Sequence, residues 1–514
     1  MHVKRHMSHG GRPTMAGCPD PLDLSPLLFR PPSADPRSAP AGLEAPLPYV
    51  GPVRVARGAA AGGAAIVHGR GLVATRAVSQ GECLMVIAPA ASADVAEVRR
   101  LWEGGGGRRS AEEVAEASLL KAMGRCAGAV SAPDPGPRVR ARARAAASFL
   151  ALASSHEEGG GGGGGGGAED EGLLDVLLGR SDPTQDPDPD PGPGRDRLLG
   201  IVRSNAFGPD YHGYDRIERE WSRGGGGSSS SSSSCSSDDG GPYRRILGLY
   251  PLAAMINHSC HSNAVRVFSG EVMAVHASSA IAEGEEVLWS YLPACQPYRA
   301  RQEQAEARFG FLCRCRRCLL EGEALSGAPE EVAGGLDELG EIGEGGGGYG
   351  GPSELRGHME RMELLLSHPS LLPGGAGRSL RLGLAGLSIG YFNAALRGAA
   401  GPASPDGGAV RRRVLDLAGL LHLSFCASNH GSTEHLSVLH LCYELAGTLE
   451  GADDDGGGGG GRRRKFWAEQ LRRAHLVRYG ALGGDLSSMR EAMRHSRGVL
   501  RNLDGLREAR WGFI

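Results

Sequence analysis

The sequence predicts an α+β protein in which a β-rich part is followed by an all-helical part. Over residues 52–89 and 243–292, short runs of Val, Ile and Leu are interrupted by Gly, as in short strands joined by tight turns. From residue 353 onward, apolar residues recur with the i, i+3, i+4, i+7 spacing of amphipathic helices. Three closely spaced cysteines, Cys313, Cys315 and Cys318, lie between the two parts.

Low-complexity tracts divide the chain. Gly accounts for 83 of the 514 residues, much of it in runs, and these runs are joined by a serine run and an Asp-Pro tract. Such tracts bury too little apolar surface to offset the entropy lost on ordering, so we expect flexible insertions at about 156–195 and 223–241. The domain organisation expected is a disordered N-terminus (1–48), a β-rich domain (49–320), a linker (321–352) and a helical domain (353–514).

Charge and apolar patterning exclude several classes of protein. The net charge of −3 disfavours direct binding of nucleic acid, and no run of ~18 apolar residues predicts a membrane span. Residues 1–17 lack the apolar segment of a secretory signal. Eleven scattered cysteines, an odd number, favour a reducing compartment. We therefore expect a nuclear or cytoplasmic monomer, with organelle targeting left open.

Individual elements follow from local signals. Ser110 and Glu113 form a capping-box pattern at the start of a helix over 110–124. Alternating residues around Ser269-Gly270 predict a hairpin over 268–275. Further helices are expected at 138–155, 195–207, 298–310, 353–368, 378–398, 410–428, 433–451, 464–482 and 486–503. The last six resemble a tetratricopeptide-like array without a strict repeat period.

The cysteine spacing C-x-C-x-x-C at residues 313–318 indicates a thiolate cluster for zinc. Structural zinc takes four ligands in a tetrahedron, so a fourth must come from elsewhere in the chain, and Cys260 is the best candidate. Such a closed site would clamp the fold without catalysing a reaction. Three unpaired surface thiols are the alternative.

Several motifs together resemble the SET domain of protein lysine methyltransferases. They are "NHSCHSN" at 257–263, "GEEVLWSY" at 284–291 and "FGFLCRCRRC" at 309–318. The resemblance extends to 68–82, 204–208 and 248–260, and it is strongest with the SET-and-MYND branch. It covers roughly residues 52–321 and implies a SET fold of short sheets with a pseudoknot and a zinc-binding post-SET segment at 309–320. Two departures are Ser262, where the family usually has Pro, and the lack of a MYND zinc finger, since residues 101–200 hold only Cys126.

The resemblance implies a site for S-adenosylmethionine. Backbone and side-chain groups of His68, Gly69, Arg70 and Gly71 would hold its methionine end, together with Asn205. Asn257 and His258 would contact the adenine, largely through their backbone, and Phe311 would stack on it. Asn263 would hold the loop in shape. The structural alternatives are a β-turn at the Gly pair, a buried histidine, a helix C-cap at Asn205 and a core Phe.

Tyr291 is the catalytic candidate that the resemblance implies, bordering the cofactor and orienting the lysine amine, and Tyr250 would line the channel. Core packing is the alternative for both. Gly284–Glu286 is interpreted as a turn with solvated acids, and four C-terminal histidines (His422, His430, His435 and His440) as surface or core residues. The expected function is methyl transfer to lysine of a histone or another protein. A catalytically weak interaction scaffold is the alternative, and a zinc hydrolase is disfavoured because four Cys leave no open position.

Overall fold

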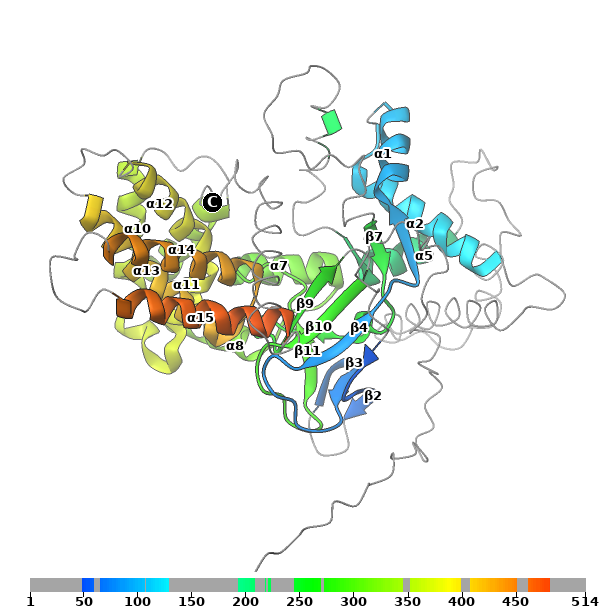
Figure 1. Cartoon of the computed structure of the whole chain (residues 1–514), viewed down its shortest axis with the longest axis horizontal. Coiled ribbons are helices and arrows are strands. Elements are labelled where there is room, and N and C mark those ends of the chain that lie inside the picture. The colour runs from blue at the N-terminus through cyan, green and yellow to red at the C-terminus, as the bar shows by residue number, and fades with distance from the viewer. Residues whose placement is uncertain are drawn as a thin grey trace, which may run out of the picture.

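The structure is a computed structural model that describes residues 49–59, 65–106, 108–128, 193–208, 218, 221–222, 245–269, 272–344, 352–398, 407–450 and 461–480. The expected helices 138–155 and 486–503, and most of the two expected insertions, lie outside these ranges. Short sheets occupy the middle of the molecule, with helices α10 to α15 on one side and α1, α2 and α5 on the other (Figure 1). None of the helices in the described ranges combines the length and hydropathy that a bilayer crossing requires.

The first sheet is antiparallel and has the strand order β1-β4-β10-β9. Its strands are β1 (Tyr49–Val50), β4 (Cys83–Ile87), β9 (Ala264–Ser269) and β10 (Val272–Ala277). Ser269 pairs with Val272 and Ala264 with Ala277, which is the pairing that the expected hairpin requires. The two turn residues between these strands lie outside the described ranges.

The second sheet places distant segments side by side, in the order β2-β3-β11-β8. It contains β2 (Val53–Ala59), β3 (Ala65–Ala74), β8 (Asn257–His258) and β11 (Glu286–Trp289). Strand β8 runs parallel to β11, with Leu288 opposite Asn257 and Trp289 opposite His258. Parallel neighbours need a long crossover, and here the β9–β10 hairpin supplies it. The motif at 257–263 therefore lies directly beside the strand that leads to Tyr291.

The third sheet, β5-β7-β6, carries the first helices. It consists of β5 (Ala91–Asp94), β6 (Ala206–Phe207) and β7 (Arg245–Leu249), and its helices are α1 (Val95–Gly104), α2 (Ala111–Gly128) and α5 (Pro193–Asn205). The capping box of α2 is confirmed: Ser110 Oγ accepts the Glu113 N–H at 3.2 Å, and the Glu113 carboxylate accepts the Ser110 N–H at 2.8 Å. Helix α1 is absent from the sequence prediction, although Asp94 Oδ1 caps it by accepting the Ala96 N–H at 2.9 Å.

The helical part comprises α7 (Tyr298–Phe309), α8 (Arg316–Gly327), α9 (Glu330–Glu344), α10 (Pro352–Leu366), α11 (Ala376–Gly383), α12 (Ala385–Gly398), α13 (Gly407–Ser428), α14 (Thr433–Glu450) and α15 (Gly461–Tyr479). Helices α13, α14 and α15 pack on one another in sequence order, whereas α9 packs on both α10 and α12. Helix α15 also lies against β9 and β10, which joins the two parts (Figure 1). A tetratricopeptide-like repeat stays a prediction.

Two expectations for this part are wrong. The linker expected over 321–352 is mostly helical as far as Glu344, since it contains the end of α8 and all of α9. Val332, Leu336 and Leu339 of α9 are buried against neighbouring helices. This i, i+4, i+7 burial outweighs the low helix propensity of the glycines. The single helix expected over 378–398 is two helices that meet at Leu384. The break follows Gly383, where a side chain would come within 3.1 Å of the Pro297 backbone.

Candidate active site and metal centre

The structure brings four cysteines together. The Sγ atoms of Cys260, Cys313, Cys315 and Cys318 all lie within 4.8 Å of one another, and those of Cys260 and Cys313 are 4.0 Å apart. Tetrahedral zinc with Zn–S bonds of about 2.3 Å needs sulfur atoms about 3.8 Å apart. Cys260 follows β8, and the other three lie at the start of α8, where Cys315 is the N-cap. The donor set and its spacing therefore fit a structural zinc ion.

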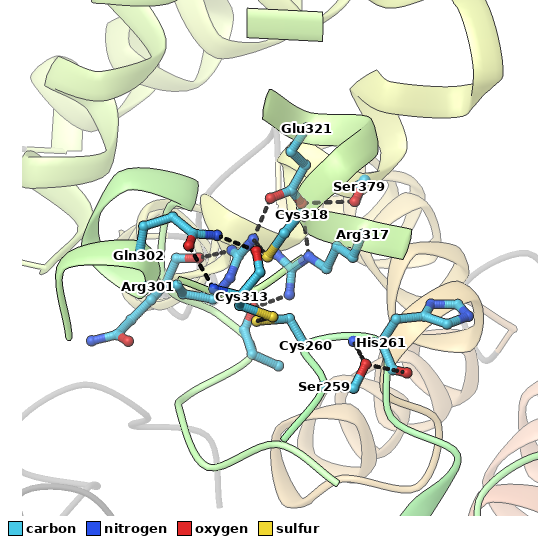
Figure 2. Close-up of polar contacts among 12 residues, drawn as sticks. Ser259, Cys260, His261, Arg301, Gln302, Cys313, Arg317, Cys318, Glu321 and Ser379 are labelled. Carbon is cyan, nitrogen blue, oxygen red and sulfur yellow. Dashed lines mark hydrogen bonds and ion pairs between the residues drawn. The ribbon is translucent and has the colours of Figure 1, made fainter. Parts of the chain in front are cut away.

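A buried ion triad lies next to this cluster (Figure 2). Arg301 on α7 and Arg317 on α8 both pair with the carboxylate of Glu321, the second through a 2.7 Å contact to Oε1. Burial alone would raise the pKa of Glu321, but the charges of Arg317 and Arg301 hold it below its ordinary value. Ser379 on α11 also donates to Oε1, at 2.7 Å.

The triad leaves one positive charge beside the sulfur atoms. Its three side chains are at most 2% exposed, and Arg301 lies 3.9 Å from Cys318 Sγ. Because charges interact strongly in the low-dielectric interior, this cation favours the thiolate form of the cluster. The pKa of Cys260 also lies well below its ordinary value, chiefly because Cys313 donates to its sulfur. The same hydrogen bonds to Cys260 raise the pKa of Cys313 and Cys318, so zinc would have to displace the protons of these thiols. The single positive charge offsets part of the net charge of −2 of a zinc–tetrathiolate complex.

Gln302 fixes the loop that carries the first of the three clustered cysteines. Its side-chain amide donates to the Cys313 carbonyl at 3.0 Å and accepts the Cys313 N–H at 2.9 Å (Figure 2). Sequence reasoning missed Gln302, Arg301, Arg317 and Glu321 as residues of the centre. The one available signal is the i, i+4 spacing of Arg317 and Glu321, which by itself is typical of any exposed helix face.

Tyr291 forms two hydrogen bonds with the residues that precede Cys260. Its hydroxyl donates to the Ile256 carbonyl at 2.8 Å, and its backbone N–H donates to His258 Nδ1 at 2.9 Å. Burial raises the pKa of Tyr291 above its ordinary value, so the hydroxyl keeps its proton. Aromatic rings surround it: the Phe309 centroid lies at 5.1 Å and that of His258 at 5.2 Å. Tyr291 thus presents a neutral hydroxyl within an aromatic wall.

The imidazole of His258 is buried and engaged on both sides. Its Nδ1 accepts from Tyr291, which leaves the proton of a neutral ring on Nε2, 3.2 Å from Cys260 Sγ. Phe311 lies half-buried beside it, with ring centroids 5.6 Å apart. Both ring nitrogens of His258 are therefore engaged within the protein, and the contact of its backbone with the adenine stays a prediction. Asn263 also holds the loop: its side chain accepts the Leu288 N–H and donates to the Glu286 carbonyl, both at 2.8 Å.

The interpretation of Gly284–Glu286 as a turn with solvated acids is wrong for Glu286. This residue belongs to β11 and is 6% exposed, and its carboxylate accepts from Asn257 Nδ2 at 2.7 Å. A Cβ at Gly71 would overlap the Glu286 carboxylate and approach Asn257 Nδ2 to 2.9 Å. Glycine is thus needed at position 71 because a buried acid lies against the backbone. Glu285 does lie in the turn, where it accepts the Ala282 N–H at 2.8 Å.

The remaining candidates are placed as follows. His68, Gly69 and Arg70 lie in β3, where Arg70 pairs with Arg57, so this segment is a strand and the alternative of a β-turn is wrong. The implied cofactor residues of β3 and β8 thus lie on either side of β11, in one sheet. Such an arrangement fits a cofactor bound across neighbouring strands.

Two candidates have contacts typical of structural residues. Asn205 ends α5 and donates to the Ile201 carbonyl of its own helix at 2.9 Å. Tyr250 is fully buried and packs edge-on against Phe207, with ring centroids 5.8 Å apart. Tyr250 belongs to the hydrophobic core against which Tyr291 packs, and its contact with Phe207 is typical of the packing alternative.

Comparison with known proteins finds a family model and several relatives that match this part of the sequence. The SET domain family model matches residues 69–292. Histone-lysine N-methyltransferase ASHR1 of Arabidopsis thaliana is 38% identical over 72 residues, which are 14% of this chain and 15% of that protein. Protein-lysine N-methyltransferase SMYD4 of Mus musculus is 34% identical over 88 residues, 17% and 11% of the two chains. N-lysine methyltransferase SMYD2-B of Xenopus laevis is 36% identical over 70 residues, 14% and 16% of the two.

A similarity to solved structures is broader but much weaker. The structure of Rubisco LSMT bound to AdoMet is 12% identical and covers 88% of both chains, with a TM-score of 0.26. At that score the superposition carries no argument.

The fold and the match over residues 69–292 define a protein that carries a SET domain. Within that class, its sequence relatives include methyltransferases of the SMYD type. The matched segments span only 11% to 16% of those relatives' lengths.

Proposed function

We propose that this protein is an S-adenosylmethionine-dependent protein lysine N-methyltransferase. The observation that carries the proposal is the double attachment of Tyr291 to the loop at 256–258, through its hydroxyl and its backbone N–H. Support also comes from the SET domain and from relatives that are lysine methyltransferases. The substrate is a protein or peptide that bears lysine, and histone and non-histone proteins both fit.

The cofactor would be held by backbone groups of residues 68–71 and 257–258 and by the ring of Phe311. When bound, it supplies a methyl group on a sulfonium. The chain's own task is to bring a neutral amine into line with that methyl group. Free lysine has a pKa of about 10.4, so most amines are protonated near neutral pH. A narrow channel that excludes water would disfavour the ammonium form, because a cation loses hydration there.

Tyr291 would orient the amine without removing its proton. Because the hydroxyl proton points to the Ile256 carbonyl, the oxygen has a lone pair left to accept an amine N–H. Because its raised pKa keeps the hydroxyl protonated, no tyrosinate is present to act as a base, and alignment is its contribution. The amine must therefore lose its proton to solvent before or during binding.

Zinc would have a structural part in this scheme. Four thiolates close its coordination sphere, so no position remains for a substrate. The ion would hold Cys260, and with it the 257–260 loop, against the start of α8. This loop contains His258 and directly follows Ile256, the two hydrogen-bond partners of Tyr291. Zinc would therefore stabilise the active centre indirectly.

Transfer of labelled methyl from S-adenosylmethionine to core histones and to whole-cell protein extract tests the proposal. The full chain should label lysine in one of these, and Tyr291→Phe should reduce the rate by about 100-fold, as expected for lost alignment. Cofactor binding measured by calorimetry should persist in the variant. If the full chain binds no cofactor, the proposal is wrong and the interaction-scaffold alternative gains. Full activity of Tyr291→Phe would remove the assigned role of the hydroxyl.

A further inference from the structure

A second group of metal-binding side chains lies in the helical part, away from the four cysteines. His422 and Cys426 are one turn apart on α13, and His435 lies near the start of α14. Their ligand atoms all lie within 4.8 Å of one another. The spacing of the C-terminal histidines along the sequence gives no metal set on a single helix face, which is why sequence reasoning treated them as surface or core residues. The reversal of the chain at residues 429–432 brings the second helix to the first.

The distances within this group are close to those of a metal complex. His422 Nδ1 lies 2.9 Å from His435 Nε2, and Cys426 Sγ lies 3.7 Å and 3.9 Å from these two nitrogens. A tetrahedral zinc ion with Zn–N of about 2.0–2.1 Å and Zn–S of about 2.3 Å separates two nitrogens by about 3.3 Å and nitrogen from sulfur by about 3.6 Å. Binding would therefore require changes of about 0.4 Å or less in these separations.

The surroundings hold both rings in place and leave one side open. His435 is fully buried and stacks on Phe425 at 5.3 Å, and His422 packs edge-on against Trp467 at 5.5 Å. Cys426, in contrast, is exposed. A metal here would have two fixed imidazoles inside, a thiolate at the surface and a fourth position towards solvent.

We propose that His422, Cys426 and His435 form a second metal site, suited to Zn²⁺, with a fourth position open to water. Two imidazoles and one thiolate are a ligand set that borderline and soft ions such as zinc and copper prefer over magnesium or calcium. This site is chemically distinct from the four-cysteine centre, because only its coordination sphere has room for an exogenous ligand.

Metal binding here must move protons in a defined way. The Gly431 N–H donates to His435 Nδ1 at 3.1 Å, so the ring proton lies on Nε2 and is shared with His422 Nδ1. When the metal takes Nε2, that proton moves to Nδ1 and the Gly431 bond opens. The Cys426 thiol loses its proton to solvent, so each metal ion bound releases one proton.

The turn between α13 and α14, next to the proposed site, contacts the β-rich part of the molecule. His430, between α13 and α14, contacts Gln80 Nε2 at 2.8 Å through its Nδ1. Asn429 Oδ1 accepts a hydrogen bond from the hydroxyl of Ser262 at 3.0 Å, and Ser262 lies two residues after Cys260. The hydroxyl of Ser262 thus forms a contact between the two parts of the molecule. A metal at the α13–α14 turn would thus stiffen the support beneath the 257–263 loop.

Metal stoichiometry of the full chain tests the proposal. After saturation with ZnCl₂ and desalting, elemental analysis should find two zinc ions per chain. Cys426→Ser and His435→Asn should each lose one ion, and Cys260→Ser should lose the other. Cys442→Ala is the matched control, since Cys442 is a buried cysteine of α14 outside both groups, and it should retain two. One ion in the unmodified chain, or two in Cys426→Ser, would overturn the proposal.

A second measurement uses the unmodified chain and does not depend on the folding of variants. Iodoacetamide should alkylate the exposed Cys426, and added Zn²⁺ should slow this alkylation at least tenfold, as followed by peptide mass spectrometry. In His435→Asn the same zinc concentration should no longer protect Cys426. Equal alkylation rates with and without zinc in the unmodified chain would also overturn the proposal.

Discussion

His258 Nε2 lies 3.2 Å from Cys260 Sγ, so one imidazole connects the proposed zinc centre to the proposed catalytic tyrosine. The opposite ring nitrogen accepts the backbone N–H of Tyr291 at 2.9 Å. Donors to a metal-bound sulfur stabilise its negative charge and fix its direction. The ring of His258 therefore stabilises the negative charge on the Cys260 sulfur. It also fixes the backbone of Tyr291, just after the end of β11.

His258→Leu should weaken zinc binding and methyl transfer together. Leucine fills much of the ring's volume but removes both hydrogen bonds. Loss of a hydrogen-bond partner of a metal ligand typically lowers affinity or activity by 10–100-fold. Competition with a chromophoric chelator measures the zinc affinity, and the methyl-transfer assay measures the rate.

His261→Leu is the matched control for this variant, since His261 lies in the same loop and outside the contact between Cys260 and Tyr291. It should retain both properties. If His258→Leu kept normal zinc affinity and normal rate, the proposed connection would have no functional weight.

Gly71→Ala should disturb the centre from the opposite strand. The added methyl group would overlap the carboxylate of Glu286, which is fixed by Asn257. Overpacking of this kind costs about 1–3 kcal/mol and displaces nearby groups. We expect cofactor binding, measured by calorimetry, to weaken at least tenfold.

Gly200→Ala is the corresponding control. A Cβ at Gly200 meets nothing within 4 Å, and the residue lies inside α5. Ala should be neutral or stabilise the helix by up to about 1 kcal/mol. Equal cofactor affinity in both variants would show that the close contact at position 71 has no role in the site.

Much of the four-cysteine centre could be predicted because three of its ligands lie close together in the sequence. Three cysteines within six residues require a fourth ligand, and the capping pair Ser110–Glu113 is a local signal with a local outcome. The parallel pairing of β8 with β11, by contrast, is non-local. This pairing was not predicted from the sequence; the resemblance to a family implied only a pseudoknot at the 257–263 motif.

The rest could not be predicted because burial depends on tertiary packing. Glu286 and Glu285 are adjacent and chemically alike, yet one is buried against Gly71 and the other caps a turn. The α9 region looks like a loop by its Gly and Glu content, but packing against α10 and α12 makes it helical. His422 and His435 meet only because a turn reverses the chain between them.

Glu321→Gln should destabilise the fold severely. The substitution leaves Arg301 and Arg317 buried without their anionic partner. Breaking a buried ion pair in this way typically costs about 3–5 kcal/mol. Urea unfolding, followed by circular dichroism, should show this loss as a lower midpoint.

Glu338→Gln is the control for this variant. Glu338 forms an exposed pair with Arg361, at 2.7 Å, and its loss should leave the midpoint nearly unchanged. A midpoint for Glu321→Gln equal to that of Glu338→Gln would mean that the triad contributes nothing to stability.

Acid should weaken the contact between β10 and the end of α15, where His276 is buried. A Cβ at Gly480 would come within 2.7 Å of His276 Nε2, so the ring packs directly on this backbone. Burial lowers the pKa of His276 to about 4; a hydrogen bond with the Arg478 backbone opposes this shift in part, and the charge of Arg478 adds to it. In the unfolded chain the pKa is near 6.5, so between pH 6.5 and pH 4 the unfolded state binds more protons and unfolding becomes easier as the pH falls. At about 1.4 kcal/mol for each pH unit, the full loss from this residue is about 3 kcal/mol.

His276→Leu isolates this effect, because leucine keeps the site apolar and cannot titrate. The free energy of unfolding should be measured by urea denaturation at intervals from pH 7.5 to pH 4. Other buried histidines, such as His435, contribute equally to both proteins, so the quantity to follow is the difference between wild type and variant. That difference should stay constant above pH 7 and then move in favour of the variant by about 3 kcal/mol as the pH approaches 4. Two parallel curves would show that the pKa of His276 is the same in the folded and unfolded protein, so that burial does not disfavour its protonation.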